Sequence, residues 1–393
     1  MNKIIILIGI ILLSACQHSP IAKVNNTAKN VITIEPKKFD IKEGLMAKYI
    51  DTMIYIPLET NDTVICGQIQ QLHRYNHKFY LFDRTTSVIF IFDEKGRFIK
   101  KIANKGRGPQ EYVRIDNYAF DKNSGNSYIF CGRSQKILEY NEWGELTRTI
   151  PCKFIISSFD VLSSNTFLLY GGTFPNETVF HETYPEQDRL AIFNVTNNEY
   201  DPLGLNWKYD ENYITPGMDK NFFHCEDTIS FIEKFGNFVY RFNTLNNQLE
   251  CHYYIDFGKY NLLYDFNTPS KQFKKLASNS KSKAKISHIL ENKNIVYIHY
   301  SFEGLMFNSL YYKDQKQTLN IGPAWINEND GVSMPSFFSV DNNYFIGITE
   351  VSVLRNIWEN PKNRLSQNLK NLIAHMQETD NPCIVIVKFK NNI

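Results

Sequence analysis

The sequence contains polar side chains that could do acid–base or metal chemistry, but they do not form one compact motif. Five of them are candidate ligand-binding residues, namely Arg114, Asp116, His224, Glu226 and His288. Carboxylate and imidazole groups can hold a metal cation such as Ca²⁺, and a bound cation can polarise a substrate or activate water. The same residue types are common at solvated strand ends, so a structural role is the competing interpretation for each of the five.

Other catalytic arrangements are missing from the sequence. It has no Gly-x-Ser-x-Gly nucleophile elbow and no His-Glu-x-x-His zinc-protease motif. Besides Cys16 there are six cysteines, none in a Cys-x-x-Cys pair or at zinc-ligand spacing from a histidine: Cys66, Cys131, Cys152, Cys225, Cys251 and Cys383. Several lie in apolar strand patterns, where a buried free thiol is the commoner outcome, although an oxidising compartment also permits disulfides. We expect no metal site of the zinc kind and no resident cofactor, and leave open a Ca²⁺ ion in a central channel.

Cys16 points to a different chemistry, that of lipid attachment. Lys3 precedes an apolar run over residues 4–13, and Ser14-Ala15-Cys16 follows directly. A basic start, a short apolar stretch and small residues are typical of a secretory signal, and this stretch covers only about half of a bilayer core. The run from Leu13 to Cys16 resembles the lipobox of bacterial lipoproteins, in which the cysteine is acylated. The alternative is an ordinary cleaved signal with an incidental cysteine.

The chain is therefore expected to have three parts: a signal peptide at 1–16, a polar tether at 17–48 and a folded domain at 49–393. No acidic run follows Cys16, which favours a protein anchored in the outer membrane and facing the periplasm over one displayed on the surface. The 43 basic and 41 acidic residues give a net charge of only +2, which predicts no nucleic-acid partner and no basic membrane-binding surface. We expect a monomer.

A repeat must position the candidate side chains. Tyr80 and Tyr128 are 48 residues apart, as are Gly96 and Gly144, and the segments around them align without a gap. Each unit has two aromatic-rich strands followed by a hairpin turn with glycine, and aromatics make up 14% of the chain. A period of this length with several short strands per unit is typical of β-propeller blades.

Six such strand pairs can be followed along the chain. They lie at 79–83 and 89–93, 127–131 and 137–141, 166–170 and 190–194, 228–232 and 239–243, 294–298 and 309–313, and 344–348 and 383–389. The last pair leaves no room for an outermost strand before the C-terminus, whereas a strand-like piece at 53–58 precedes the first unit. We therefore predict an all-β, six-bladed β-propeller in which this N-terminal strand closes the last blade. A β-sandwich of many hairpins is the alternative.

Three segments interrupt the repeat. Apolar residues at helical spacing from Leu365 to Met376 predict an amphipathic helix on the rim of the last blade, which covers a blade edge or docks a partner. The six lysines at 271–285 predict a solvated loop, with an acidic glycan or anionic headgroups as an alternative. The glycine-containing loop at 106–112 predicts a stiff turn between blades, because it lacks the Lys-Ser/Thr and the helix of a phosphate-binding loop.

Four short motifs resemble those of one family. They are Tyr55-Ile56-Pro57-Leu58-Glu59-Thr60, Phe92-Asp93-Glu94-Lys95-Gly96, Gly106-Arg107-Gly108-Pro109-Gln110-Glu111-Tyr112 and Asp380-Asn381-Pro382. The set is similar to the six-bladed β-propeller lipoproteins of gut-type Gram-negative bacteria, which are related in fold to NHL-repeat and TolB-like propellers. Gln110 stands where that family usually has a second glycine. The resemblance implies a fold and a cell-envelope location, and it implies no catalytic motif.

Two function classes fit these features. The first is a binding or interaction module for a glycan, a peptide or another envelope protein, since ligands of propellers usually meet the loops. The second is a metal-assisted propeller enzyme of the lactonase or lyase type that uses the central channel. We prefer the binding module, because fold alone confers no activity and the sequence has no catalytic motif.

Overall fold

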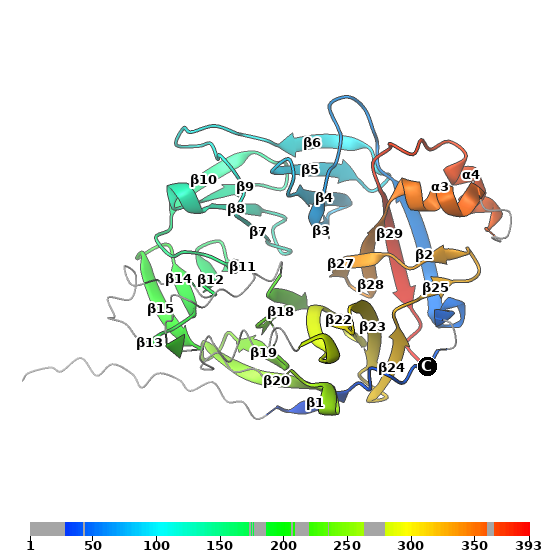
Figure 1. Cartoon of the computed structure of the whole chain (residues 1–393). Coiled ribbons are helices and arrows are strands. Elements are labelled where there is room, and N and C mark those ends of the chain that lie inside the picture. The colour runs from blue at the N-terminus through cyan, green and yellow to red at the C-terminus, as the bar shows by residue number, and fades with distance from the viewer. Residues whose placement is uncertain are drawn as a thin grey trace, which may run out of the picture.

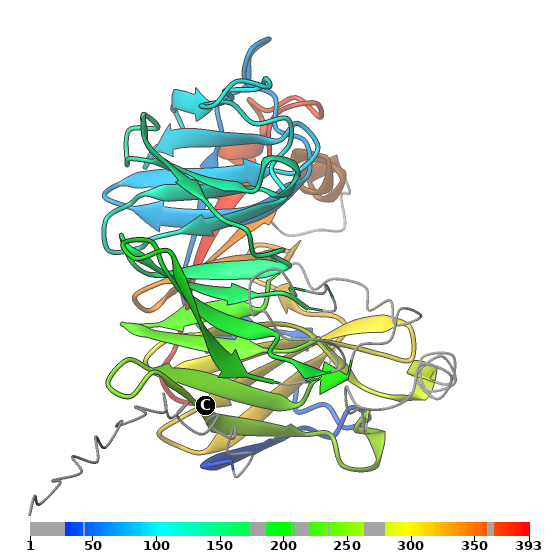
Figure 2. The same cartoon turned by 90° about the vertical axis from the view of Figure 1, so that its left-hand side faces the viewer.

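The chain forms a ring of six β-sheets, and the predicted six-bladed propeller is confirmed (Figure 1). The structure is a computed structural model that describes residues 28–41, 44–172, 174, 176, 186–205, 207–208, 220–234, 236–262, 280–359 and 365–393. Seen from the side, the sheets stack around the ring with their faces against one another (Figure 2). Six hydrophobic clusters therefore join side chains of neighbouring blades; one, for example, unites Tyr80 and Ile91 of the first blade with Tyr118 and Ile129 of the second.

The first three blades follow the sequence order from the innermost strand outward. Blade 1 contains β3 (Ile69–Tyr75), β4 (Lys78–Asp83), β5 (Val88–Asp93) and β6 (Phe98–Ile102). Blade 2 contains β7 (Asn117–Phe120), β8 (Ser127–Cys131), β9 (Lys136–Tyr140) and β10 (Leu146–Pro151). Blade 3 contains β11 (Ser158–Ser163), β12 (Thr166–Tyr170), β14 (Leu190–Asn194) and β15 (Glu199–Gly204).

Of the other three blades, blades 4 and 6 each include a strand from the N-terminal part of the chain. Blade 4 contains β17 (Phe222–Cys225), β18 (Thr228–Ile232), β19 (Phe238–Asn243), β20 (Gln248–Asp256) and, outermost, β1 (Asn30–Thr33). Blade 5 contains β21 (Lys285–Glu291), β22 (Ile295–Phe302), β23 (Leu305–Tyr312) and β24 (Gln317–Gly322). Blade 6 contains β27 (Ser336–Asp341), β28 (Tyr344–Thr349), β29 (Cys383–Phe389) and β2 (Ile50–Pro57).

The six predicted strand pairs are the middle strands of the six blades. Their buried aromatic and β-branched residues pack on both faces, as in β4 and β5, where all but Asp93 are buried. The predicted turn glycines have positive φ angles, 79° at Gly96 and 71° at Gly144, a backbone conformation that glycine adopts without a steric penalty.

The ring closes where the sequence predicts it. Strand β2 pairs antiparallel with β29, with Tyr55 opposite Val385. Beyond β2 the backbone N–H of Glu59 donates to the carbonyl oxygen of Gly96 at 2.8 Å, which fastens the closing strand to blade 1. A Cβ atom on Gly96 would lie 2.0 Å from the carbonyl oxygen of Pro57, so the close approach requires glycine.

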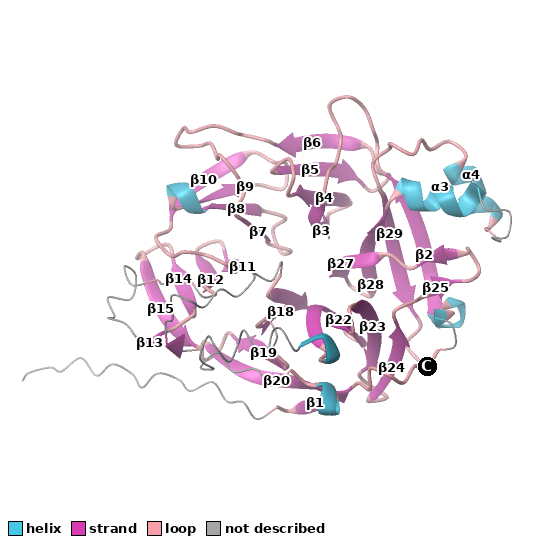
Figure 3. Ribbon diagram, viewed as in Figure 1, coloured by secondary structure: helices cyan, strands magenta, loops and turns pink. Residues whose placement is uncertain are grey.

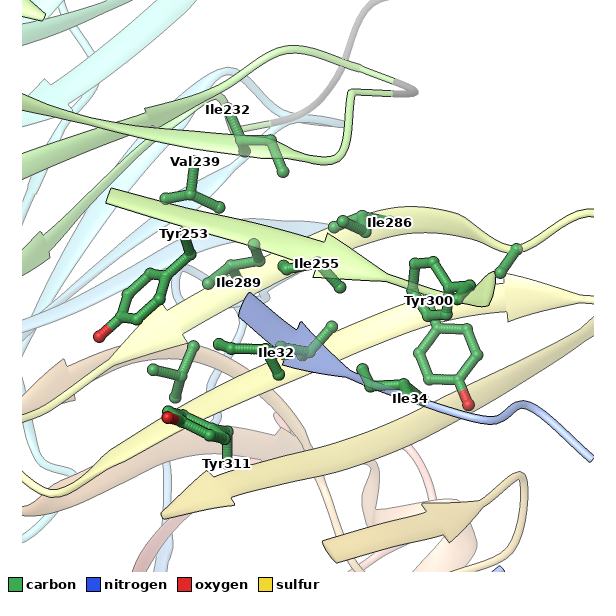
Figure 4. Packing of buried hydrophobic residues seen from close by; sticks show 14 of the residues in the cluster. Ile32, Ile34, Ile232, Val239, Tyr253, Ile255, Ile286, Ile289, Tyr300 and Tyr311 are labelled. Carbon is green, nitrogen blue, oxygen red and sulfur yellow. The ribbon is translucent and has the colours of Figure 1, made fainter. Parts of the chain in front are cut away.

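The predicted tether at 17–48 is wrong in its second half. Strand β1 joins blade 4 as a fifth strand, parallel to β20, and the fold therefore begins near Asn30 rather than at residue 49. The physical reason is a short alternation in which Ile32 and Ile34 are fully buried while Val31 is 55% exposed. Figure 4 shows Ile32 and Ile34 among Ile255, Tyr300 and the other apolar side chains between blades 4 and 5.

Two short α-helices fill the insertion between β28 and β29, where the sequence predicts one (Figure 3). The predicted apolar pattern corresponds to α4 (Gln367–Ile373), where the Ser366 hydroxyl caps the helix by accepting from the backbone N–H of Leu369. The additional helix, α3 (Val351–Glu359), buries Val351 and Leu354. Both helices pack against Val332 and Cys383, so in this structure the insertion covers the edge of blade 6.

The remaining described elements are short. They are the 3₁₀ turns η2 (Ala47–Tyr49), η3 (Gly132–Ser134), η4 (Gly258–Tyr260) and η5 (Ser280–Ser282), and the two-stranded pieces β13 (Glu186–Gln187) with β16 (Trp207–Lys208) and β25 (Ile326–Asn327) with β26 (Val332–Ser333). Most of the lysine-rich segment at 271–285 lies outside the described residues. Within the described part, no helix has the length and apolarity to cross a membrane. The six cysteines predicted as buried or paired are free thiols, and only Cys66 is partly exposed.

Candidate functional site

The turns that follow the innermost strands gather at one end of the ring axis and surround a polar pocket of about 700 Å³. Five blades contribute to what we call the channel mouth. Its lining residues are Arg74, Tyr75, Asn76, His77, Lys122, Asn123, His224, Glu226, Asp227, Glu291, Asn292, Lys293, Val340, Asp341, Asn342 and Asn343.

The backbone of these turns explains their composition. Asn76 and His77, between β3 and β4, have φ angles of 45° and 59°, and Asn342, between β27 and β28, has a φ angle of 53°. Tight hairpin turns require such left-handed residues, and asparagine tolerates them better than most side chains. Because these turns favour asparagine, side-chain amide groups surround the channel mouth.

Ion pairs join the turns of different blades. Arg74 of blade 1 contacts the Asp341 carboxylate of blade 6 at 3.0 Å, and the two side chains are 25% and 29% exposed. Lys122 of blade 2 lies 3.9 Å from Asp227 of blade 4, a longer and more exposed contact. These pairs set the relative positions of the turns more than they stabilise the fold, because exposed pairs contribute little.

Glu291 forms the buried part of the wall. Its side chain is 0% exposed, and one carboxylate oxygen accepts from Lys313 at 2.7 Å and from Arg241 at 3.1 Å. The hydroxyl of Tyr253 donates to the same oxygen at 3.1 Å. Blades 4 and 5 are therefore joined beside the mouth by a buried, charge-assisted network.

Other lining groups remain available to a ligand. Glu226, Lys293 and Asn343 make no side-chain hydrogen bond or ion pair within the described part of the chain. They come from blades 4, 5 and 6, so a ligand seated in the mouth would meet an acid, a base and an amide on three sides.

Behind the mouth, the centre of the ring is narrow and polar. The ammonium of Lys220, which precedes β17 of blade 4, donates to the backbone oxygen of Phe338 in blade 6 at 3.3 Å. Blade 5 separates these two blades in the ring, so one lysine side chain bridges strands that are not neighbours. His224 of blade 4 contacts the Asp160 carboxylate of blade 3 at 2.9 Å.

Burial changes the protonation of this central cluster. It lowers the pKa of His288 to about 3, with Lys220 and His299 lowering it further. Burial likewise lowers the pKa of His73, which stacks on Phe120 at 4.8 Å. The pKa of the Lys220 ammonium falls to about 8 for the same reason, partly offset by Asp160. At neutral pH the imidazoles of His73 and His288 are therefore uncharged, and Lys220 is their cationic neighbour.

The five predicted site residues fall into separate places. His224 and Glu226 line the channel mouth. His288 lies on β21, and its Nε2 atom is buried without a hydrogen-bond partner in the described part. Arg114 and Asp116 contact each other at 2.5 Å and line a second pocket of about 450 Å³. The structure thus does not bring the five together.

A metal-assisted enzyme would need several carboxylate or imidazole ligands close enough together to hold one cation. Among the described residues, no group of three His, Cys, Asp or Glu side chains is arranged to hold a metal ion.

The prediction missed Arg74, Asp160, Lys220 and Asp341. Each lies in or beside an innermost strand, and innermost strands are the weakest part of the repeat because β7 and β17 have only four residues. A usable signal was present, since Arg74 and Asp341 come just before the predicted middle strands, at the ends of innermost strands.

Comparison with known proteins supports the fold and a family. The family described as "Domain of unknown function (DUF4934)" matches residues 29–388. A candidate exported protein from Bacteroides fragilis has a similar structure, with a TM-score of 0.71 and 17% identity over 92% of this chain and 100% of that chain. A member of the DUF4221 family from Bacteroides vulgatus gives a TM-score of 0.50 and 13% identity over 87% and 97% of the two chains. No curated protein sequence matches this chain.

Proposed function

This chain belongs to the DUF4934 family, and we propose that it is a lipid-anchored binding module of the cell envelope whose channel mouth binds a neutral oligosaccharide. The observation that carries the proposal is the polar pocket of about 700 Å³ formed by turns of five blades. A pocket of this size lies within the range of small-molecule sites.

The chemistry of the lining favours a hydroxyl-rich ligand over an apolar peptide. Peptide sites usually provide apolar grooves for anchoring side chains. The channel mouth instead offers five asparagines together with acidic and basic side chains, and among its described lining residues Val340 is the only aliphatic one and Tyr75 the only tyrosine. Amides and carboxylates donate to and accept from sugar hydroxyls, and Tyr75 provides one ring for stacking.

Export and anchoring form the second half of the proposal. The segment from Leu13 to Cys16 resembles a lipobox, and the similar Bacteroides fragilis protein is a candidate exported protein. Both features support secretion, and the lipobox resemblance supports an acyl anchor on Cys16. We place the protein at the outer membrane, facing the periplasm, and relate it to the NHL- and TolB-like propeller lipoproteins that its motifs resemble.

Binding can be tested on the chain from Gln17 onward, which keeps every described residue. Isothermal titration against neutral oligosaccharides and against unstructured peptides should detect binding of a saccharide. The double variant Lys293→Ala/Asn343→Ala should weaken that binding about tenfold, since two ligand hydrogen bonds contribute about 1–3 kcal/mol together. Lys100→Ala is the matched control, because Lys100 is exposed on β6 and does not line the mouth.

Three outcomes would count against the oligosaccharide proposal. The first is binding of peptides alone, and the second is saccharide affinity that the double variant leaves unchanged. The third is a large thermal stabilisation by Ca²⁺ that a chelator reverses, which would favour a metal-dependent function.

The anchor has a separate test. Cys16→Ser removes the thiol that would be acylated, so the variant should move from the membrane fraction to the soluble fraction of the cell envelope. Unchanged partition into membranes would show that Cys16 is not the anchor, and it would leave the binding proposal untouched.

A further inference from the structure

A second concave site lies on the opposite face of the ring from the channel mouth. It is a pocket of about 450 Å³ between the loop from blade 1 to blade 2 and the turn between β8 and β9. The β7–β8 turn contributes to the mouth, and the β8–β9 turn lies at the other end of β8. The two pockets are therefore independent of each other.

The loop at 106–112 is held rigidly around an internal carboxylate. Glu111 accepts from the backbone N–H of Gly108 at 2.8 Å. A Cβ atom on Gly106 would lie 1.9 Å from a Glu111 carboxylate oxygen, so a side chain at Gly106 would displace that carboxylate. The hydroxyl of Tyr112 is buried and donates to the backbone oxygens of Ser87 and Ile102, both at 3.0 Å. The loop that the sequence predicts as a stiff turn is therefore packed around the carboxylate of Glu111, one of its own residues.

The buried Lys136 on β9 ties this loop to blade 2. Its ammonium donates to the backbone oxygens of Gly108 at 3.1 Å and Pro109 at 2.7 Å. The two walls of the pocket are therefore fixed before any ligand arrives, which reduces the entropy cost of binding.

The charges around this pocket do not balance. Four cationic side chains line it, Arg107, Arg114, Arg133 and Lys136, against the two carboxylates of Glu111 and Asp116. Both carboxylates are already engaged. Glu111 is held by Gly108, and Asp116 accepts from the Gly132 N–H at 2.8 Å and from Arg114 at 2.8 Å.

Two guanidinium groups are left over. Arg107 and Arg133 are exposed, and neither has a hydrogen bond or an ion pair within the described part of the chain. They approach the pocket from its two walls, the 106–112 loop and the η3 turn, and Ser134 adds a hydroxyl beside Arg133. Guanidinium groups bind planar or tetrahedral oxyanions through paired N–H donors.

We infer that this pocket is a binding site for an oxyanion group, a phosphate, sulfate or carboxylate carried by a small ligand. Arg107 and Arg133 donate to the anion from opposite walls, and Ser134 supplies a further hydrogen bond. The site does not depend on the channel mouth. The carboxylates of Glu111 and Asp116 are bonded to other groups of the pocket wall, so they do not neutralise Arg107 and Arg133.

The test is an NMR or calorimetric titration of the chain from Gln17 onward with inorganic phosphate, sulfate and acetate. We expect a Kd of about 1 mM, and the affinity should weaken steeply with added salt. The double variant Arg107→Gln/Arg133→Gln should lose at least tenfold in affinity. The control Lys100→Gln/Arg97→Gln removes the same charge from exposed positions of blade 1 outside this pocket and should bind as the unchanged protein does.

The three anions distinguish the ligand chemistry. Preference for phosphate or sulfate over acetate assigns a tetrahedral anion, and the reverse assigns a carboxylate. The inference is overturned if none of the anions binds up to about 10 mM. It is equally overturned if the arginine variant and the control lose the same affinity, because the binding would then reflect net charge. Melting curves of both variants show whether a loss arises from unfolding.

Discussion

Glu291 is the residue on which the wall of the channel mouth depends most. Its fully buried carboxylate faces Lys313 at 2.7 Å and Arg241 at 3.1 Å. Glu291→Ala would leave two cations without their acid, and breaking a buried pair in this way usually costs about 3–5 kcal/mol. We expect the free energy of unfolding in urea to fall by that amount.

The exposed pair of Lys29 and Glu250 on blade 4, the neighbouring blade, provides the control. Its side chains are 62% and 36% exposed, so Glu250→Ala should cost less than about 1 kcal/mol. Equal losses for the two variants would mean that Glu291 does not hold blades 4 and 5 together.

His288 allows a pH prediction with a defined sign. Its pKa is about 3 in the folded chain, against an ordinary value of 6.5 in the unfolded chain. Between these values the unfolded chain binds a proton that the folded chain does not, so stability falls as the pH falls through this window. The loss is at most about 1.4 kcal/mol per pH unit.

His288→Gln removes this dependence. As the pH is lowered from about 6 to about 4, the unchanged protein should therefore lose more unfolding free energy than the variant does. His77→Gln, at a side chain that is 75% exposed, should leave the pH dependence as it is. A slope that survives in His288→Gln would mean that His288 is not a buried neutral imidazole.

Which residues form the candidate site was the hardest property to predict from the sequence. The choice of His224 and Glu226 placed two residues at the mouth, because both lie next to the inner turn of blade 4. Lys220 could not be chosen in this way, since its role depends on reaching across the ring to Phe338, 118 positions away in the chain. Contacts across the ring axis depend on the diameter of the ring, which a local sequence pattern does not indicate.

At the scale of elements, strands with a continuous run of apolar residues could be predicted from the sequence, and short strands could not. The middle strands were visible because their apolar residues are continuous, as in β5. Strand β1 was missed because it has only four residues. So short an alternation of buried and exposed residues gives too weak a signal among the neighbouring asparagines and lysines. Helix α3 was missed because Val351 and Leu354 span barely one turn.

Strand β1 can be tested by two neighbouring substitutions. Ile32 is 0% exposed within the cluster between blades 4 and 5, so Ile32→Ala should lower the unfolding free energy by about 2–5 kcal/mol. Val31 is 55% exposed, so Val31→Ala should change it by less than about 0.5 kcal/mol. Similar values in urea unfolding would indicate that the N-terminal strand does not pack on blade 4.

At the scale of the whole molecule, the sequence predicted the closure because blade 6 lacked a strand at its own end of the chain. The same argument could not predict that blade 4 would gain a fifth strand, since blade 4 was already complete. The two N-terminal strands therefore have different roles: β2 closes the ring, and β1 covers an outer edge.

This difference predicts the outcome of two truncations. A chain that begins at Gly44 loses β1 and keeps β2, so it should unfold in one cooperative transition at a lower melting temperature. A chain that begins at Leu58 also loses β2, which leaves the hydrogen-bonding edge of β29 open and the ring unclosed. Because open edges pair with other chains, this protein should aggregate or elute as oligomers in size-exclusion chromatography.

A synthetic peptide of residues 48–59 provides the decisive arm of that experiment. Added during refolding, it should pair with β29 as a donor strand and restore a monomer to the chain that begins at Leu58. A peptide of the same length with Ile54 and Ile56 exchanged for aspartate should fail, because Ile56 packs with the cluster between blades 6 and 1. If the chain that begins at Leu58 were monomeric without any peptide, the six sheets would form a stable ring without the N-terminal strand, and closure by β2 would not be what holds the propeller together.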